Sequence, residues 1–217
     1  MNRARIAAVA ALVAFAALLA ALTGRPERGH ATAYAAVLCG GSNRWDVKTL
    51  SDLRGPDAPK LKRNAERRTI NYLVTQEHGP IGKHTPRLLG VERTKYVLTD
   101  VTLIEAKVEE DQDVHLVIRD EQGEPGDHMI VEFPNVDYNV TAPTRYKNQI
   151  AQARADVAAL IPQCRTGFKK GWAQFRDGTT ATIRGVGFFD LVHGSNLHGV
   201  AENEVELHPV LAFHGSC

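Results

Sequence analysis

The sequence has little of what marks the specialised protein classes. Its 217 residues include three cysteines, two methionines, two tryptophans and 6% aromatic side chains. Its 26 basic and 25 acidic side chains nearly balance, so neither sign of charge dominates. Collagen-like repeats, low-complexity tracts and a series of apolar spans are all missing, which excludes fibrous, disordered and multi-span membrane proteins. The remaining composition is ordinary for a globular protein, and at this length we expect one domain with appendages.

The one long apolar run lies at the N-terminus. Residues 6–22 are apolar without interruption, follow Arg3 and Arg5, and lead to a small-x-small pattern at 33–35. This layout predicts a secretory signal peptide over residues 1–35, cleaved after Ala35, and hence a secreted or extracytoplasmic protein without membrane contact. An uncleaved membrane anchor is the alternative, because 17 apolar residues approach the length that spans a bilayer. The many alanines are only weakly hydrophobic, which favours cleavage.

Charge is segregated along the rest of the chain. Residues 36–95 hold 12 basic and 6 acidic side chains, residues 96–140 hold 2 and 12, and residues 141–217 hold 8 and 6. No segment is basic enough for a general polyanion binder, so we expect no nucleic-acid partner. The opposite charges of the first two segments predict that basic residues of the first dock onto an acidic turn of the second. The basic residues are Lys60, Lys62, Arg63, Arg67 and Arg68, and the turn holds Glu109, Glu110, Asp111 and Asp113.

All three cysteines follow the predicted signal peptide. Cys39, Cys164 and Cys217 would meet an oxidising environment after export, so we expect one disulfide and one remaining thiol. The spacing leaves all three pairings open. None of the cysteines has a neighbouring histidine or a helix start that would lower its thiol pKa, which argues against a catalytic cysteine.

The residue pattern changes at residue 96. Residues 36–95 are rich in glycine and proline, which predicts an irregular N-terminal arm with one helix over residues 60–76. From residue 96 on, β-branched and aromatic residues alternate with turn residues, which predicts a three-stranded meander. We expect its strands at 96–108, 113–119 and 128–133, and two further strands at 180–190 and 205–213.

An apolar stripe at helical spacing separates the third and fourth predicted strands, and Pro162 is expected to end this helix of about 18 residues. The resulting order β-β-β-α-β-β over residues 96–217 is that of the five-stranded Greek-key barrel called the OB-fold. An open α+β sandwich has the same order, but Gly185 and Gly187 in the fourth strand favour a barrel with close-packed bends. The stripe comprises Tyr146, Ile150, Ala153, Val157, Leu160 and Ile161.

Several motifs occur in the same order as in a family of small exported bacterial proteins that has no assigned activity. They are RWDVKT at 44–49, DVHLV at 113–117, MIVEFP at 129–134, GVGFFD at 185–190 with HG at 193–194, and ELHPV at 206–210. The chain resembles this family over nearly its whole length after residue 35. The resemblance implies export and a barrel fold. The family pattern before Glu206 has proline and glycine where this chain has Glu202 and Glu204.

Polar residues interrupt the apolar pattern of three predicted strands. Glu206 and His208 share one strand face, as do Asp113 and His115, and Glu132 breaks the apolar third strand. If the strands converge, His115, Glu132, Glu206 and His208 form a divalent metal site, because imidazole and carboxylate are normal Zn²⁺ ligands. Asp113 could support such ligands. The favoured interpretation is instead a hydrogen-bonded cluster that fixes the strand register, since no His-Glu-x-x-His or Cys-x-x-Cys spacing occurs.

A second polar group follows the fourth predicted strand. The loop between the last two strands of an OB-fold commonly lines its binding face, so we expect a ligand site at Asp190, His193, Asn196 and His198. Ser195, His193 and Asp190 are also the residue types of a hydrolase triad. They are sequence neighbours without a Gly-x-Ser-x-Gly elbow, which argues against that role.

Few aromatic side chains are present to stack on a ligand. Trp45, Trp172, Phe188 and Phe189 are candidates, and because Phe188 and Phe189 are adjacent on a strand, at most one can be a surface platform. The favoured interpretation is a non-enzymatic extracytoplasmic binding module for an unidentified ligand, with a divalent metal as the one cofactor to consider. The alternatives are a metal-dependent hydrolase acting on phosphodiesters and a purely structural envelope protein.

Overall fold

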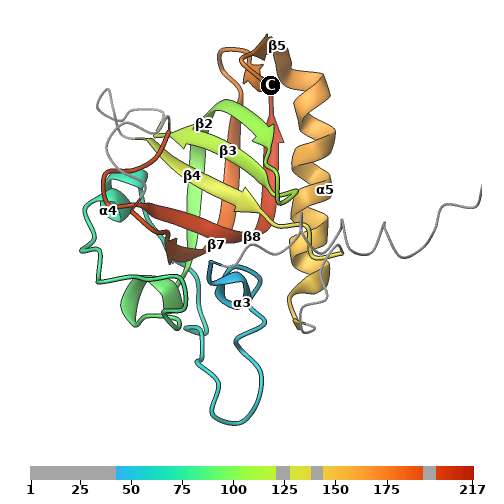
Figure 1. Cartoon of the computed structure of the whole chain (residues 1–217). Helices are drawn as coiled ribbons and strands as arrows, with labels where there is room; N and C mark the ends of the chain where they lie inside the picture. The colour runs from blue at the N-terminus through green and yellow to red at the C-terminus, as the bar shows by residue number, and fades with distance from the viewer. Residues whose placement is uncertain (1–42, 121–127, 138–143, 193–198) are drawn as a thin grey trace, which may run out of the picture. The chain divides into compact units, whose positions relative to one another are not determined.

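Five strands close into a barrel in the order predicted from the sequence. The computed structural model describes residues 43–120, 128–137, 144–192 and 199–217, all within the unit Ala36–Cys217. β2 pairs with β3 and β7, β3 with β4, and β7 with β8, all antiparallel, whereas β4 and β8 are parallel. This is the OB-fold connectivity, and its closure excludes the open sandwich (Figure 1). The strands are β2 (Lys95–Val108), β3 (Val114–Arg119), β4 (His128–Phe133), β7 (Thr180–Phe189) and β8 (Val205–Ser216).

β7 passes close to its neighbours at two glycines. A Cβ on Gly187 would lie 2.6 Å from Cγ1 of Val91, and one on Gly185 would lie 2.8 Å from Cβ of Leu207. The pairing of β7 with β8 also shifts register around both glycines. The expectation that these positions exclude a side chain in a close-packed bend is therefore confirmed.

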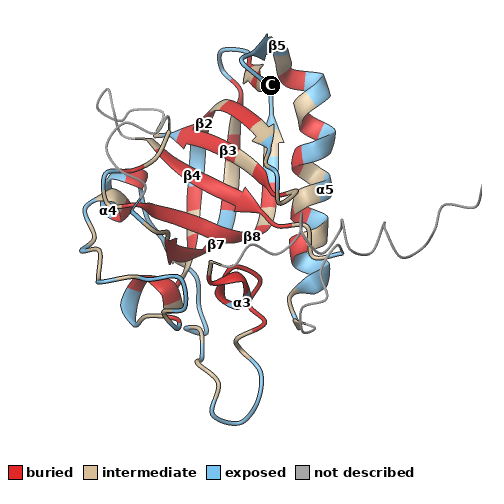
Figure 2. Cartoon of the chain, in the orientation of Figure 1, coloured by how far each residue is buried: buried red, intermediate tan, exposed pale blue. Residues whose placement is uncertain are grey.

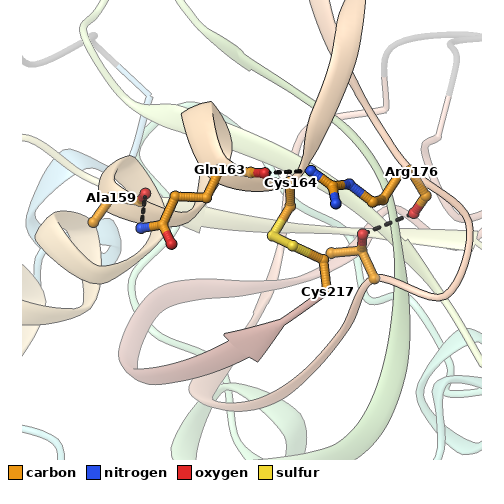
Figure 3. The surroundings of a disulfide bond; sticks show 6 residues. Ala159, Gln163, Cys164, Arg176 and Cys217 are labelled. Carbon is orange, nitrogen blue, oxygen red and sulfur yellow. Dashed lines mark hydrogen bonds between the residues drawn. A yellow bond between two sulfur atoms is a disulfide. The ribbon is translucent and has the colours of Figure 1, made fainter.

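One long helix packs against the barrel. α5 (Lys147–Cys164) contacts β8 and β4, and most of the predicted apolar stripe is buried against them. The expectation that Pro162 ends the helix was wrong, because a proline removes one N–H without preventing the final turn from continuing. That turn is held from outside, since Cys164 forms a disulfide with Cys217 and the guanidinium of Arg176 donates to the Gln163 carbonyl (Figure 3). The Cys164 carbonyl also accepts a hydrogen bond from the backbone N–H of Arg176. Cys39 lies outside the described residues.

The segment after α5 is a hairpin that the sequence did not predict. β5 (Arg165–Lys169) pairs with β6 (Trp172–Phe175), and β6 adds to the barrel at β2. The two residues between them, Lys170 and Gly171, have φ of 51° and 87°. Positive φ at both central residues is what a two-residue hairpin turn requires, so a lysine here adopts a conformation that usually selects glycine or asparagine.

The N-terminal arm is folded along the barrel. It contains α3 (Trp45–Lys48), β1 (Glu66–Arg67), α4 (Ile70–Val74) and the 3₁₀-helix η1 (Gly90–Arg93). The prediction of a helix over residues 60–76 was wrong except for the part that forms α4. Residues 66–67 instead pair in parallel with β2, and Thr69 caps the short helix that follows. Many arm residues are buried, as Figure 2 shows for α3. Among the described residues, no helix is long and apolar enough to cross a membrane.

Candidate metal centre

Strand alternation places the predicted metal residues on the outer wall of the barrel. Core residues such as Leu116 and Leu207 point inward, so the polar residues beside them point outward. The register pairs His115 of β3 with Glu132 of β4, and Glu206 follows on the adjacent β8. The residues therefore lie on the outer wall and not in the interior, which apolar side chains fill.

The structure brings together the four residues that were expected to converge, with a fifth beside them. Asp113 and His208 have no exposed surface, and Glu132 and Glu206 are less than a tenth exposed. His208 is the centre of the group, because its two ring nitrogens lie near three carboxyl groups. We call these residues the carboxylate–histidine cluster: Asp113, His115, Glu132, Glu206 and His208.

The N-terminal arm covers this part of the wall. α3 places Lys48 in the same cavity as Glu132 and Glu206, with its ammonium 5.4 Å from the ring centre of Phe188. Trp45 and Val47 of the same short helix are buried. The cluster is therefore buried by a segment that lies more than sixty residues away in the sequence, and not by the barrel itself.

Two buried arginines hold the arm in this position. Arg44 donates to both carboxylate oxygens of Glu92, at 2.8 and 2.6 Å, and to the Phe189 carbonyl at 2.7 Å. Arg87 donates to both carboxylate oxygens of Asp52, at 2.7 and 2.9 Å. Such bidentate pairs fix orientation as well as charge. We call Arg44, Asp52, Arg87 and Glu92 the arginine staple.

The staple also fixes the backbone next to Lys48. Arg87 Nη2 donates to the Val47 carbonyl at 2.6 Å, and Arg87 Nη1 donates to the Glu92 carbonyl at 2.8 Å. Glu92 also accepts from the backbone N–H of Phe189 at 3.0 Å, where β7 ends. These bonds join the arm to the end of the barrel strand beside the cluster.

Both ring nitrogens of His208 face carboxylate oxygens. Nδ1 lies 3.1 Å from Oε2 of Glu132 and 3.6 Å from Oε2 of Glu206, whereas Nε2 lies 3.6 Å from Oδ2 of Asp113. Neither nitrogen makes a hydrogen bond, even at 3.1 Å, so the oxygens lie off the directions in which the ring could donate or accept. The imidazole is surrounded by acceptors without being bonded to them.

His115 supports Glu132 from the other side. Its Nδ1 lies 3.0 Å from Oε1 of Glu132 and 3.5 Å from Oε1 of Glu109. Its ring packs edge-on against Trp172, with ring centres 5.3 Å apart. The two oxygens of Glu132 thus face two different histidines, one on each neighbouring strand.

Unpaired polar atoms concentrate in the cluster. Within the part of the chain that the structure describes, seven buried side-chain nitrogen or oxygen atoms lack a hydrogen-bond partner, and five belong to the cluster. Buried polar atoms in native proteins are normally paired, and each exception calls for an explanation such as a ligand or ion. The five atoms are Oδ2 of Asp113, Nε2 of His115, Oε2 of Glu206 and both ring nitrogens of His208.

Electrostatics keep one carboxylate charged and the central imidazole neutral. Burial disfavours a charge on Glu132, but the hydrogen bond with His115 and the charge of Lys48 favour it, and the pKa of Glu132 lies below its ordinary value. Burial lowers the pKa of His208 to about 3, and Lys48 and His115 add to this effect, while Glu132 opposes it. Neutral imidazole is the form that binds a metal ion.

The other two carboxyl groups of the cluster resist ionisation. Burial raises the pKa of Asp113 well above its ordinary value, and the neighbouring charge of Glu132 adds to it. Burial also raises the pKa of Glu206, and the neighbouring carboxylates of Glu132 and Asp190 raise it further. Burial alone would lower the pKa of Lys48, but the surrounding carboxylates raise it above its usual range. A bound cation would relieve the repulsion among these acids.

The spacing of the cluster suits a single metal ion. Asp113, Glu132 and His208 can each offer one atom such that all three lie within 4.8 Å of one another. On the Nδ1 side of His208, Oε2 of Glu132 and Oε2 of Glu206 lie 3.1 and 3.6 Å from that nitrogen. Two ligand atoms on one ion stand about 3 Å apart without lying on each other's axis, which is how Nδ1 and Oε2 of Glu132 are arranged.

A cavity of about 480 Å³ opens beside the cluster. Glu132, Glu206 and His115 reach it, whereas Asp113 and His208 lie behind its lining. Three parts of the barrel form it: the β2–β3 turn, the outer faces of β3, β4 and β8, and the chain between β7 and β8. Its lining is Asn43, Lys48, Glu109, Glu110, Asp111, His115, Ile130, Glu132, Asp190, Val200 and Glu206.

The two sites expected from the sequence share this cavity in part. Asp190 lines it, and its Oδ2 lies 3.6 Å from Nζ of Lys48. His193, Asn196 and His198 lie outside the described residues, as does Ser195 of the hydrolase alternative, so those expectations stay predictions. Asp190 is placed by its backbone N–H, which donates to the Glu204 carbonyl at 3.0 Å.

Among the described residues, the five basic arm residues named for this docking form no ion pair with the acidic turn. Lys62 and Arg68 each pair with Glu66 of the arm at 2.8 Å. The basic residue that faces acidic groups of the barrel is Lys48. The charge segregation indicated the right two segments but the wrong residues. Lys48 makes the contact, and it lies in a largely apolar stretch that becomes buried.

The aromatic candidates are not surface platforms. Phe188 and Phe189 are both buried, because the arm covers the outer wall of the barrel at the end of β7. Phe188 lies 5.4 Å from the His208 ring, and Phe189 packs edge-on against His78. Trp45 is buried as well, and Lys107 lies over the ring of Trp172 at 4.6 Å.

Lys48 is the site residue that the sequence reasoning missed. A usable signal was present, since Trp45, Val47 and Leu50 surround a lysine with apolar residues. Such a segment is expected to be buried, and a buried lysine needs acidic partners. Searches against protein-family models, curated proteins and solved structures find no match to this chain, so the family resemblance inferred from its motifs stays a prediction.

Proposed function

We propose that this protein is an extracytoplasmic binding module whose outer barrel wall binds a divalent metal ion. The ligands are Nδ1 of His208 and one carboxylate oxygen each from Glu132 and Glu206. Asp113 faces Nε2 of His208 from behind and sets the orientation of the ring. One observation carries the proposal: five buried polar atoms of a single cluster have no hydrogen-bond partner among the described residues.

The Nδ1 side of His208 is favoured over the Nε2 side for two reasons. Its two carboxylate oxygens are 3.1 and 3.6 Å from the nitrogen, and both acids reach the cavity. Asp113 is fully buried behind the ring, where an ion would have no path for entry or for a water ligand. A histidine bonded to the metal commonly turns its other nitrogen toward a carboxylate, which is the role this leaves for Asp113.

The position and charge of the cavity also support a cation ligand. The β2–β3 turn, the faces of the second and third barrel strands and the segment before the last strand form the usual ligand-binding face of an OB-fold. Six acidic residues and one lysine line the cavity here. This excess of acidic groups attracts cations and repels phosphate groups. One imidazole with two carboxylates suits Zn²⁺, Mn²⁺ or Fe²⁺ better than Ca²⁺, which prefers oxygen ligands alone.

Export is part of the proposal. Residues 1–35 have the layout of a secretory signal peptide, and the disulfide between Cys164 and Cys217 suits an oxidising compartment. A metal-binding module outside the cytoplasm would meet free metal ions directly.

Metal-dependent hydrolysis is the second candidate function. The observation that favours it is the cavity itself, which leaves room for water and a small substrate beside an ion held by only three protein ligands. The acidic lining argues against the phosphodiester substrates expected from the sequence. Hydrolysis of uncharged esters or amides that is lost with a chelator and restored by Zn²⁺ would support this candidate.

Metal titration tests the proposal. Chelator-treated protein is titrated with Zn²⁺, Mn²⁺ and Ca²⁺ by calorimetry, and its melting temperature is measured with each ion. We expect stoichiometric binding of one transition-metal ion and a higher melting temperature. His208→Gln and Glu206→Gln should abolish binding, and Asp113→Asn should weaken it by roughly tenfold or more.

An exposed histidine on the same strand supplies the matched control. His214 lies on β8 and is exposed, so His214→Gln should bind metal as the unaltered protein does. Absence of heat and of any melting shift with all three ions would reject the proposal. Equal binding by His208→Gln and His214→Gln would place the ion elsewhere.

A further inference from the structure

Lys48 occupies an unusual position for a residue beside a metal site. Its side chain is 11% exposed, and its ammonium lies 3.6 Å from Oδ2 of Asp190. It lines the same cavity as Glu132 and Glu206, and attraction from both acids opposes the loss of its charge on burial. A positive charge therefore lines the same cavity as the acids that would bind a second positive charge, the metal ion.

We infer that Lys48 is a tethered counter-cation that determines which metal ions the site retains. This inference rests on the proposed function. Without metal, the ammonium balances the carboxylates of the cluster. With metal, it repels the ion, so every divalent cation binds more weakly than the carboxylates alone would allow.

Lys48 repels all divalent ions equally, but the bond to His208 that offsets this repulsion differs from ion to ion. Two positive charges in a partly buried site repel each other according to charge and distance, whatever the element. The bond to the His208 imidazole, by contrast, is strong for Zn²⁺ and its neighbours and weak for Ca²⁺ and Mg²⁺. The repulsion lowers the binding free energy of both kinds of ion by the same amount, so only the ions that bind imidazole strongly keep a useful affinity. Lys48 thus sets the selectivity threshold without touching the ion.

The arm keeps this charge in place. Arg87 holds the Val47 carbonyl at 2.6 Å, immediately before Lys48, and the Thr49 hydroxyl donates to the Trp45 carbonyl at 2.8 Å immediately after it. Both neighbours of Lys48 along the chain are therefore bonded. The side chain can shift on its flexible stem when an ion enters, but its backbone cannot carry it away from the cluster.

The test compares metal affinities of variants at position 48. Zn²⁺ and Ca²⁺ are titrated into the full mature chain, into Lys48→Met and into Lys48→Arg. Lys48→Gln serves where Lys48→Met does not fold without metal. Lys62→Met is the matched control, because it removes a lysine charge from an exposed ion pair in the same arm.

We expect Lys48→Met to bind Zn²⁺ roughly tenfold or more tightly than the unaltered chain, and to bind Ca²⁺ measurably. Lys48→Arg and Lys62→Met should keep the original affinities. The inference is overturned if Lys48→Met binds Zn²⁺ no more tightly, or if Lys48→Arg behaves as Lys48→Met does. If Zn²⁺ binds only after Lys48 is removed, the inference stands and the proposed function fails. If no variant binds metal, both fail.

Discussion

Two buried polar groups lie at the contact between the N-terminal arm and the barrel, and they differ in how their atoms are paired. In the arginine staple, both oxygens of Glu92 accept hydrogen bonds from Arg44 and from backbone N–H groups. In the carboxylate–histidine cluster, both nitrogens of His208 lack such a bond although three acids surround them. Both groups are buried and contain acidic residues, but their hydrogen bonding differs.

The difference separates the structural role of the staple from the metal-binding role proposed for the cluster. A buried ion pair with all its hydrogen bonds made holds two segments in one arrangement. A buried group with unpaired atoms costs stability and persists where a ligand or a reaction requires it. Buried charge alone would have marked both groups as candidate sites. Pairing marks only the cluster.

The largest effect is expected from breaking the staple. Arg44→Met leaves the Glu92 carboxylate buried without its partner, and both side chains have no exposed surface. The loss of unfolding free energy should be about 3–5 kcal/mol, measured by urea denaturation. Lys62→Met, which removes an exposed pair, should cost less than about 1 kcal/mol. A loss for Arg44→Met as small as that control would show that the staple is not structural.

Metal should stabilise the protein through the cluster alone. Zn²⁺ at a hundred times its dissociation constant should raise the unfolding free energy by about 2.7 kcal/mol. Glu132→Gln should lose this increment. Asp52→Asn weakens the staple instead. It should lower the metal-free stability but keep the stabilisation by Zn²⁺. If both variants lose the increment equally, the two groups are not independent.

Acid should weaken the cluster in a way that depends on His208. Its pKa falls from 6.5 to about 3 on folding, so the unfolded chain binds its proton more readily. The stability contributed by the neutral imidazole is complete above pH 6.5 and is lost as the pH falls toward 3. The difference in unfolding free energy between the unaltered chain and His208→Gln should therefore shrink by about 1 kcal/mol per pH unit below that value, measured with chelator present. A difference that is constant from pH 7 to pH 5 would contradict a neutral buried His208.

The smallest effect distinguishes the two groups most directly. Burial raises the pKa of Glu206, so Glu206→Gln replaces a carboxyl that resists ionisation and should change metal-free stability by less than about 1 kcal/mol, including a gain. The same substitution in the staple, Glu92→Gln, removes a charged acceptor of four hydrogen bonds and should cost about 2 kcal/mol or more. Urea unfolding at pH 7 measures both. Equal losses would mean that the cluster is as structural as the staple.

Local patterning predicted the barrel well. The alternation along residues 96–133 and the helical stripe of α5 depend on neighbours close in sequence, and both are confirmed. The hairpin β5–β6 was missed because its turn uses Lys170 at a positive φ, where glycine or asparagine is the usual signal. The helix expected over 60–76 failed because β2 offers an edge to residues 66–67, a pairing that no local pattern reveals.

The candidate site was predicted in its members but not in its setting. His115, Glu132, Glu206 and His208 stood out because each interrupts an apolar strand. Which face of the barrel they occupy depends on the register of three strands that meet only on closure. The cover over them comes from Lys48 and its neighbours, whose place depends on two arginine pairs spanning 35 and 48 residues.

Sequence alone determined the strand order, the helix, the scarcity of cysteine and the polar residues that interrupt the strands, because each of these is written in short-range spacing. Tertiary structure decided that the wall carrying those residues faces outward, that the arm buries it, and that one lysine is enclosed with its acids. Contacts of that kind join distant segments, and their energy depends on which atoms remain unpaired when water is excluded. That pairing exists only in the folded chain.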